Sequence, residues 1–540
     1  MGDRVAASLW ARARDWRDED PDPETRAELT TVLDAHDEAG LADRFAPTLT
    51  FGTAGLRAEL GAGPNRMNRA VVMRASSGLA QYVTRRGGQR VVVGFDARRK
   101  SDVFARDAAA VLRGAGLEVL LMPRALPTPL VAFAVRALGC DAGAMITASH
   151  NPPRDNGYKV YLADGRQIVS PADAEIAAAM DRVANLAEIP RREFWQTVPE
   201  DVIEAYVRQV AALVSPTAPR DVRIVYTPMH GVGRDVFCAV LRAAGFAQPE
   251  VVPEQAEPDA NFPTVPFPNP EEPGALDMAL ALAEERRPDV LIAHDPDADR
   301  CAAAVNGRML RGDELGVLLG WQLLRRAGSA RQGAFATTIV SSSLLGKLAA
   351  KGGVDYVETL TGFKWLSRVP NLRYGYEEAL GYCVAPTLVG DKDGMSAGLL
   401  LAELVAVLKA EGKTLFDVLD ELAIEFGLHA VDQLTIRTRD SAVLVQRLRA
   451  HPPKRIDTRR VVSIEDLEAG AGGLPPTLGL RMRLEGNARV VVRPSGTEPK
   501  LKCYLELVLP VHRSVTATRE RARCELEELK RGLQTAIAQP

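Results

Sequence analysis

The chain has 540 residues, of which 46% are hydrophobic and 25% are charged, and its formal net charge at pH 7 is −3. This length predicts several domains, and the composition is ordinary for a soluble globular protein. The charge balance gives no reason to expect nucleic acid as a partner, and no run of about 18 uncharged apolar residues predicts a membrane helix. The start of the chain lacks the apolar segment of a signal peptide, and six widely spaced cysteines form no CxxC pair. We therefore expect a cytoplasmic protein with reduced thiols.

Helix and strand patterns alternate along most of the chain. Residues 1–45 are charged and helical, with a break at 20–23. Buried strands are then expected at 90–94, 117–122 and 142–146, with helices at 103–113 and 127–138. The same rhythm restarts near 221, after a helical stretch at 200–214, and again near 312, with a strand at 335–340 and a helix at 395–408. Strands that alternate with helices indicate βαβ units and mainly parallel sheets.

The last part of the chain has a different pattern. Strand signals at 432–436 and 489–492 precede a charged helix at 515–537, which predicts a smaller α+β domain. The expected division is an N-terminal helical extension at 1–45, three α/β domains at 46–214, 215–311 and 312–428, and the α+β domain at 429–540.

A serine and a histidine stand together where one buried strand ends. The segment Thr147-Ala148-Ser149-His150-Asn151-Pro152-Pro153 follows the apolar run at 142–146. A hydroxyl beside an imidazole, on a loop made rigid by two prolines, is typical of a nucleophile presented at a sheet edge. Taken alone, the pair is also ordinary turn chemistry.

Three carboxylates follow a second buried strand, at 290–293. Asp295, Asp297 and Asp299 alternate along the loop, and hard oxygen ligands at a strand's carboxyl end suit Mg²⁺. A solvated acidic loop is the simpler alternative. A Ca²⁺ loop of the EF-hand type is excluded, because Arg300 and Asn306 occupy the positions of its Gly and Glu. An Asp-x-Asp phosphatase or dehalogenase-like enzyme is the rival activity, but it has no use for the Ser149 loop.

A third loop combines an arginine, two hydroxyls and a glycine. In Arg493-Pro494-Ser495-Gly496-Thr497-Glu498-Pro499-Lys500, the arginine offers a bidentate fork, and the glycine lets backbone N–H groups approach an anion. The loop therefore predicts a phosphate site, with an ordinary Pro/Gly turn as the alternative.

Together the three loops resemble the α-D-phosphohexomutase superfamily, and within it the phosphoglucomutase-2/phosphopentomutase-like branch. Further segments match in the family's order: FGTAGLR at 51–57, GFDARRKS at 94–101, NGYKVY at 156–161, TGFK at 361–364, YEEALGY at 376–382 and GDKDG at 390–394. The resemblance runs from about Thr48 to the C-terminus, and the joint match is far more specific than any single segment.

The resemblance implies an α/β fold of four domains around a central cleft: three similar mixed-sheet α/β domains and a smaller C-terminal α+β domain. It implies an intramolecular phosphotransferase that interconverts a sugar 1-phosphate and its 6-phosphate through a phosphoserine enzyme and a bisphosphate intermediate. Glucose is the first expectation and mannose the second. A phosphopentomutase acting on ribose or deoxyribose phosphates and a non-catalytic sugar-phosphate sensor remain alternatives. Mg²⁺ is the expected cofactor, a sugar bisphosphate the activator, and a monomer or homodimer the expected state.

The same resemblance assigns roles to residues. Ser149 would carry the phosphoryl group and bind the metal together with Asp295, Asp297 and Asp299. The expected catalytic residues also include Arg57, His150 and Lys159; His150 and Lys159 are both candidates for the base, with loop orientation and phosphate counter-charge as their alternatives. Expected substrate-binding residues are Arg300, Gly362, Lys364, Glu377, Lys392, Arg493, Ser495, Gly496 and Thr497. For Arg300 an ion pair with the aspartates is the alternative role. Ala379 stands where the family often has Ser, which weakens the expectation of a hexose.

Overall fold

The computed structural model describes residues 2–46, 48–51, 55–327, 332–438, 440–470, 473–495 and 500–538, without the side chains of residues 2–7. The chain forms two compact units. The first joins Met1–Leu310 with Gly381–Ala406, and the second joins Arg311–Leu380 with Val407–Pro540. The five-part division expected from the sequence stays a prediction.

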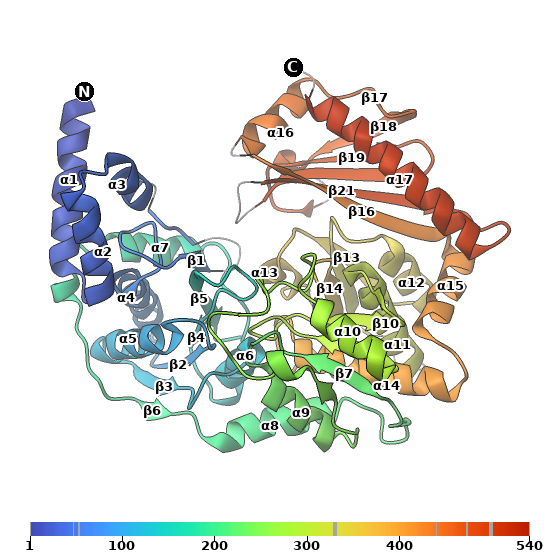
Figure 1. The fold of residues 1–540 in the computed structure, drawn as a ribbon, viewed down its shortest axis with the longest axis horizontal. Helices are drawn as coiled ribbons and strands as arrows, with labels where there is room; N and C mark the ends of the chain where they lie inside the picture. Colours follow the sequence, from blue (N-terminus) through green and yellow to red (C-terminus); the bar gives the residue numbers. More distant parts are fainter. Residues whose placement is uncertain are drawn as a thin grey trace. The chain divides into compact units, whose positions relative to one another are not determined.

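Three helices open the first unit: α1 (Gly2–Glu19), α2 (Pro23–Asp34) and α3 (Glu38–Phe45) (Figure 1). After the break that follows α1, helix α2 begins with a capped N-terminus. The Asp22 side chain accepts the Glu24 N–H, and a proline occupies the first turn. Glu28 of α2 accepts the Ala62 N–H at 3.0 Å, and Asp22 also pairs with Lys100. The extension is thus tied to two segments that border the site described below.

The first sheet of this unit has the strand order β1 (Leu56–Glu59), β5 (Asp155–Leu162), β4 (Ala142–Ile146), β2 (Arg90–Phe95), β3 (Glu118–Leu121) and β6 (Gln196–Thr197). Strand β2 runs parallel to β3 and β4, whereas β5 is antiparallel to both β4 and β1. The sheet is therefore mixed. Its buried core strands are close to where the apolar runs of the sequence predicted them.

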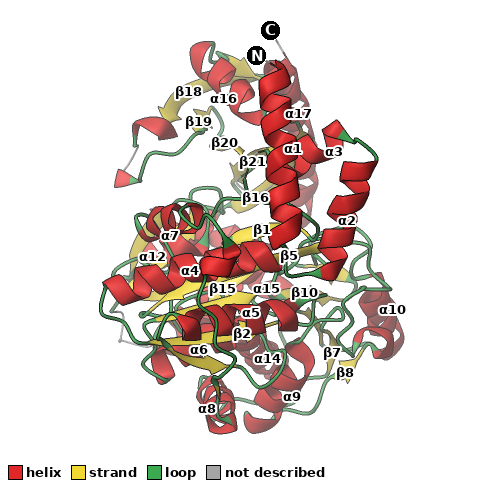
Figure 2. Cartoon of the chain, turned by 90° about the vertical axis from the view of Figure 1, so that its left-hand side faces the viewer, coloured by secondary structure: helices red, strands yellow, loops and turns green. Residues whose placement is uncertain are grey.

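Helices cover both faces of this sheet (Figure 2). On one face α4 (Arg69–Arg85) packs against α5 (Ser101–Gly114) and α7 (Ala172–Asp181), over a core that includes Val91 and Val93. On the other face lies α6 (Thr128–Ala137). It packs very closely, because a Cβ at Gly94 or Gly143 would lie 2.4 or 2.5 Å from valine side chains of α6.

The second sheet of the first unit has the order β11 (Arg308–Met309), β10 (Ala302–Val305), β9 (Val290–Ala293), β7 (Ile224–Thr227) and β8 (Glu250–Val251). Strand β7 is parallel to β8 and β9, and β10 and β11 continue the sheet antiparallel. The helices α9 (Gly233–Ala243) and α10 (Asp277–Arg286) pack against this sheet, and α8 (Glu200–Ala211) packs against α9. The strand β15 (Gly381–Cys383) and the helix α14 (Gly394–Ala410) come later in the chain.

The second unit begins with a parallel sheet in which β12 (Ala334–Thr338) lies between β13 (Asp355–Thr359) and β14 (Leu372–Glu377). The helices α11 (Gly312–Ala327), α12 (Leu344–Gly352), α13 (Phe363–Leu366) and α15 (Leu415–Phe426) accompany it. An antiparallel sheet follows, in the order β16 (Leu428–Arg437), β21 (Lys500–Leu509), β20 (Ala488–Pro494), β19 (Leu480–Leu484), β18 (Arg459–Asp466) and β17 (Arg455–Ile456), with α16 (Ser441–Ala450) and α17 (Val515–Ala538). The expected fold class, with three α/β domains and a C-terminal α+β domain, is confirmed.

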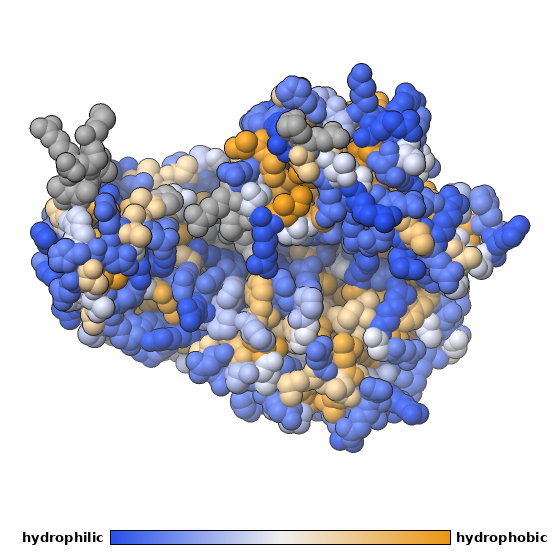
Figure 3. Space-filling model, turned by 45° about the horizontal axis from the view of Figure 1, so that its top comes forward, coloured by the Kyte–Doolittle hydropathy of each residue, from blue (hydrophilic) through white to orange (hydrophobic). Residues whose placement is uncertain are grey.

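Polar residues dominate the face of the molecule drawn in Figure 3, and hydrophobic residues gather there only in smaller groups. Across the described ranges, none of the helices combines the length and apolar character needed to span a bilayer.

Candidate active site

The Ser149 loop leaves the carboxyl end of β4 in a constrained conformation. Ser149 is buried and has φ of +54°, in the left-handed region that non-glycine residues rarely adopt. The Thr147 hydroxyl accepts the Ser149 N–H at 2.8 Å and donates to Asp96 at 2.6 Å. Strain of this kind persists only where the surroundings over-determine the geometry, so the loop is built to hold Ser149 in one position.

Arg98, from the loop after β2, supplies most of that support. Its guanidinium donates to the carbonyls of Ser149 (2.6 Å), Asn151 (2.7 Å), Pro152 (2.9 Å) and Asp155 (3.2 Å). The side chain is buried, and its Nε lies 3.5 Å from the Asp96 carboxylate. One residue therefore anchors the whole turn that follows Ser149.

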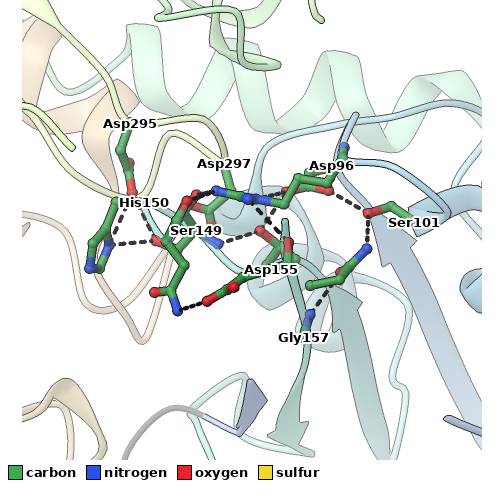
Figure 4. Close-up of polar contacts among 12 residues, drawn as sticks. Asp96, Ser101, Ser149, His150, Asp155, Gly157, Asp295 and Asp297 are labelled. Carbon is green, nitrogen blue, oxygen red and sulfur yellow. Dashed lines mark hydrogen bonds and ion pairs between the residues drawn. The ribbon is translucent and has the colours of Figure 1, made fainter. Parts of the chain in front are cut away.

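Ser149 and His150 both point toward Asp295 (Figure 4). The Ser149 hydroxyl donates to Asp295 Oδ2 at 2.8 Å, and His150 Nδ1 lies 3.2 Å from the same hydroxyl. Burial lowers the pKa of His150 well below its usual value, and the nearby Arg300 and Arg57 lower it further. A neutral imidazole next to Ser149 can accept a proton or donate one, according to its tautomer.

The loop that carries the three aspartates follows β9 and is fixed from two sides. The Thr128 N–H donates to Asp297 O at 2.9 Å, and the Val232 N–H donates to Pro296 O at 2.9 Å. Gly231 has no room for a side chain, because its Cβ would lie 2.4 Å from the Pro296 backbone. Asp297 in turn accepts a hydrogen bond from the Thr128 hydroxyl at 2.5 Å.

The carboxylates of Asp295, Asp297 and Asp299 converge within the part of the chain that the structure describes. All three are fully buried, and one oxygen from each lies within 4.8 Å of the others. The Oδ1 atoms of Asp297 and Asp299 have no hydrogen-bond donor among the described residues. Buried oxygens left in this state are costly, and a hard divalent cation such as Mg²⁺ would satisfy them. The donor set therefore fits the expected metal.

The electrostatics of the three aspartates differ. Burial and the charges of Asp297 and Asp299 raise the pKa of Asp295 well above its usual range. Burial would also raise the pKa of Asp297, but the Lys159 ammonium and hydrogen bonds from Lys159 and Thr128 hold it below the usual value. The pKa of Asp299 is lowered as well, since Lys159, Lys392 and Arg300 outweigh its burial and the neighbouring charge of Asp297. A divalent cation would favour the ionised form of all three.

Cations expected from the sequence surround this group. Lys159 Nζ lies 2.7 Å from Asp297 Oδ2 and 2.8 Å from Asp299 Oδ2, and Lys392 Nζ lies 3.3 Å from Asp299 Oδ2. Arg300 pairs with Glu271 at 3.2 Å, and its backbone N–H donates to Asp295. Arg57 reaches the Ser149 loop by donating to Asn151 Oδ1 at 3.2 Å.

The segment that carries Lys392 is held on both sides of that residue. Asp391 accepts hydrogen bonds from Tyr161 at 3.0 Å and Gln167 at 2.7 Å, and Asp393 accepts one from Tyr206 at 2.8 Å. These contacts join the segment to the first sheet and to α8. Distant parts of the fold therefore help to position Lys392.

The other expected substrate-binding residues belong to the second unit. Gly362 caps α13 with φ of +106°, a conformation that favours glycine, and Lys364 Nζ lies over the Trp365 ring, 5.7 Å from its centroid. Glu377 ends β14, Arg493 lies near the end of β20, and the Ser495 N–H donates to Lys500 O at 2.8 Å. Gly496 and Thr497 lie outside the described residues, as do Gly52, Thr53 and Ala54 of the expected N-terminal segment.

Two residues that the sequence did not single out are central to this geometry. Arg98 falls inside the matched segment at 94–101, where an arginine two residues after a buried aspartate was the available signal. Thr128 stands between two prolines at the start of α6 and carried only a helix-start signal. Arg98 contacts residues that lie 51 to 57 positions away in the sequence, and Thr128 contacts a residue 169 positions away.

Comparison with known families matches four successive parts of the chain. Residues 48–187, 204–308 and 311–426 match the phosphoglucomutase/phosphomannomutase alpha/beta/alpha domains I, II and III, and residues 446–509 match the C-terminal domain of the same proteins. The chain belongs to the α-D-phosphohexomutase superfamily. It is a phospho-sugar mutase of this family, so the expected family and the type of reaction are both confirmed.

Individual relatives carry the same family names. A protein of Haemophilus influenzae described as a probable phosphomannomutase is 45% identical over 82% of this chain and 93% of its own length. A probable phosphoribomutase of Schizosaccharomyces pombe is 36% identical over 91% of this chain and 92% of its own. A crystal structure from Thermus thermophilus, provisionally described as a phosphomannomutase, superposes with a TM-score of 0.71 at 28% identity, covering 90% of this chain and 99% of that one.

Proposed function

We propose that this phosphohexomutase interconverts the 1-phosphate and 6-phosphate of an aldohexose, with glucose as the preferred sugar and mannose as the second. The reaction would proceed through phosphorylated Ser149 and a sugar bisphosphate that turns over within the site. The observation that carries the proposal is the 2.8 Å contact between the Ser149 hydroxyl and Asp295 Oδ2, beside two buried carboxylate oxygens that lack a donor among the described residues.

Each half of the proposed cycle exchanges one bond for another. A sugar hydroxyl oxygen attacks the phosphorus on Ser149, the bond between phosphorus and Ser149 Oγ breaks, and a sugar bisphosphate results. The hydroxyl proton leaves the sugar, and one proton returns to Ser149 Oγ. After the bisphosphate reorients, its other phosphoryl group passes back to Ser149 by the reverse exchange. Positioning and charge neutralisation supply most of the catalysis in such a transfer.

Two residues are candidates for moving these protons. Neutral His150, 3.2 Å from Ser149 Oγ, suits the proton that Ser149 takes up or gives away. Lys159 lies in ion pairs with Asp297 and Asp299, which favours its role as a counter-charge to the aspartates and the transferring phosphoryl group. The base that takes the sugar proton is one of these two.

The expected Mg²⁺ would be held by Asp295, Asp297 and Asp299, together with an oxygen carried by Ser149. When bound, it supplies a positive charge that neutralises the phosphoryl group. Arg98 holds the backbone of the Ser149 turn, while Lys392 and Arg300 add positive charge beside the aspartates.

The sugar and its second phosphate would be bound by residues of the second unit. The Glu377 carboxylate can accept hydrogen bonds from two sugar hydroxyls, which suits a ligand that binds in two orientations. Arg493 and Ser495, with Gly496 and Thr497, would anchor the phosphate that is not being transferred. Gly362 and Lys364, also of the second unit, and Lys392 of the first unit complete the proposed contacts. A sugar bisphosphate would prime an unphosphorylated Ser149.

A pentose substrate is the second candidate. Ala379 removes a hydroxyl that the family often has in this loop, and the Schizosaccharomyces pombe relative is described as a phosphoribomutase. The Haemophilus influenzae relative, described as a phosphomannomutase, supports a hexose.

The deciding experiment is a kinetic panel of the 1-phosphates of glucose, mannose, ribose and deoxyribose, with Mg²⁺ and a catalytic amount of sugar bisphosphate. We expect the highest kcat/KM for glucose 1-phosphate, followed by mannose 1-phosphate. A higher value for either pentose would refute the hexose assignment and leave the phosphoserine mechanism intact.

A further inference from the structure

The two oxygens of the Asp297 carboxylate have opposite environments. Oδ2 accepts hydrogen bonds from Lys159 Nζ at 2.7 Å and from the Thr128 hydroxyl at 2.5 Å. Oδ1 is buried and has no donor among the described residues. One oxygen is therefore saturated by protein donors, and the other remains available to a cation.

Lys159 does not distinguish Asp297 from Asp299. Its ammonium lies almost midway between two carboxylates, 2.7 Å from Asp297 Oδ2 and 2.8 Å from Asp299 Oδ2, and it attracts both. Of the three aspartates, Asp297 is the one to which the Thr128 hydroxyl donates in the described part of the chain, and this hydroxyl carries no charge that would repel a divalent ion. Thr128 is thus an uncharged donor to Asp297 Oδ2, beside the ammonium that Asp297 shares with Asp299.

Thr128 is itself held rigidly in place. It is fully buried at the start of α6, and its backbone N–H donates to Asp297 O at 2.9 Å, so one residue grips both the main chain and the side chain of Asp297. The close packing of α6 on β2 and β4, which requires Gly94 and Gly143, fixes the height of this helix start above the sheet. Prolines on either side of Thr128 restrict the backbone further.

We propose that Thr128 is a positioning residue for the divalent-cation site, and that its hydroxyl orients Asp297 so that Oδ1 faces the ion. The inference rests on the proposed metal site but adds a residue to which neither the sequence nor the family comparison gave a role. Partners that orient a ligating carboxylate typically change metal affinity by about 10- to 100-fold when they are lost. The hydroxyl should act on metal affinity, while the sugar contacts of the second unit stay unchanged.

The test measures Mn²⁺ binding to the full-length chain by electron paramagnetic resonance of the free ion, without substrate. Thr128→Val removes the hydroxyl and keeps the branched shape, whereas Thr128→Ser keeps the hydroxyl and removes a methyl group. We expect Thr128→Val to weaken Mn²⁺ binding by about 10- to 100-fold. The Mn²⁺ affinity of Thr128→Ser should stay within about threefold of that of the wild-type chain, a much smaller change than the one expected on loss of the hydroxyl.

Turnover gives a second readout. At saturating metal, Thr128→Val should recover most of its kcat, and its KM for the sugar phosphate should match that of the wild-type chain. Wild-type Mn²⁺ affinity in Thr128→Val would overturn the proposal, and so would equal losses in the Val and Ser variants, because the hydroxyl would then not be the cause.

Folding is checked by thermal melting in the presence of a chelator. If Thr128→Val does not fold, Thr128→Ala replaces it, and the Ala and Ser variants then decide in the same way. No Mn²⁺ binding by the wild-type chain would instead contradict the metal site of the proposed function. Failure of that site and failure of the role of Thr128 are therefore distinct results.

Discussion

Replacing Arg98 by methionine should loosen the Ser149 turn and destabilise the first unit. The change removes four hydrogen bonds to carbonyls, at 2.6, 2.7, 2.9 and 3.2 Å, and leaves the buried Asp96 carboxylate without its guanidinium. Bonds from a charged donor contribute about 1.5 to 3 kcal/mol each, and breaking a buried ion pair costs about 3 to 5 kcal/mol. These contributions overlap, because all belong to one side chain, so we expect a loss of about 4 kcal/mol.

The assay compares melting temperatures of Arg98→Met and Arg99→Met. Arg99 is the adjacent residue, and its side chain is 63% exposed in a surface pair with Glu24. A loss of about 4 kcal/mol corresponds to a decrease of roughly 6 °C for a unit of about 340 residues, at about 2.1 cal/mol/K of unfolding entropy per residue, whereas the surface control should change by less than about 2 °C. Mutase turnover should fall by about 100-fold in Arg98→Met, since small misplacements of a reacting group have effects of that order. Equal melting temperatures and turnover for the two variants would refute the role assigned to Arg98.

Three further outcomes are expected. Asp297→Asn should weaken Mn²⁺ binding by at least about 10-fold in the same resonance titration, and unchanged affinity would contradict the metal site. Arg493→Ala should lower kcat/KM for both isomeric monophosphates by similar factors, because both use the same phosphate anchor; unchanged kinetics in both directions would make the loop an ordinary turn. Burial raises the pKa of Asp313 to about 7, so the folded state holds an extra proton between about pH 4 and 7, and stability falls as pH rises through that window, by at most about 4 kcal/mol. Asp313→Asn should remove this part of the pH dependence. If the melting temperatures of the wild-type chain and the variant changed equally with pH, Asp313 would not be the cause.

The sequence predicted the positions of individual strands better than it predicted which strands pair with one another. Apolar runs placed the buried strands β2, β4 and β9 within one or two residues, since burial on both faces leaves a continuous apolar pattern. The antiparallel strand β5 was not predicted. It carries Lys159, a charged residue that is nevertheless buried, and its pairing with β4 depends on contacts that no local pattern encodes.

The sequence predicted part of the candidate site, namely the residues that lie in short matched segments. Residues in short matched segments, such as Ser149, Asp297 and Lys159, were expected, and the structure brings them together. Arg98 and Thr128 were missed, because their roles arise from buried hydrogen bonds to segments far away in the chain. Such partners become visible only when the fold supplies the geometry.

The most direct test of the central claim is the mass of the intact protein after exposure to a sugar bisphosphate. We expect the addition of one phosphoryl group, located on Ser149 by peptide analysis, and its loss when a sugar monophosphate is then added. The Ser149→Ala variant should fold, gain no phosphoryl group and show no mutase turnover. A wild-type protein that turns over substrate while Ser149 is never phosphorylated, or a Ser149→Ala variant with near wild-type turnover, would contradict the proposed mechanism.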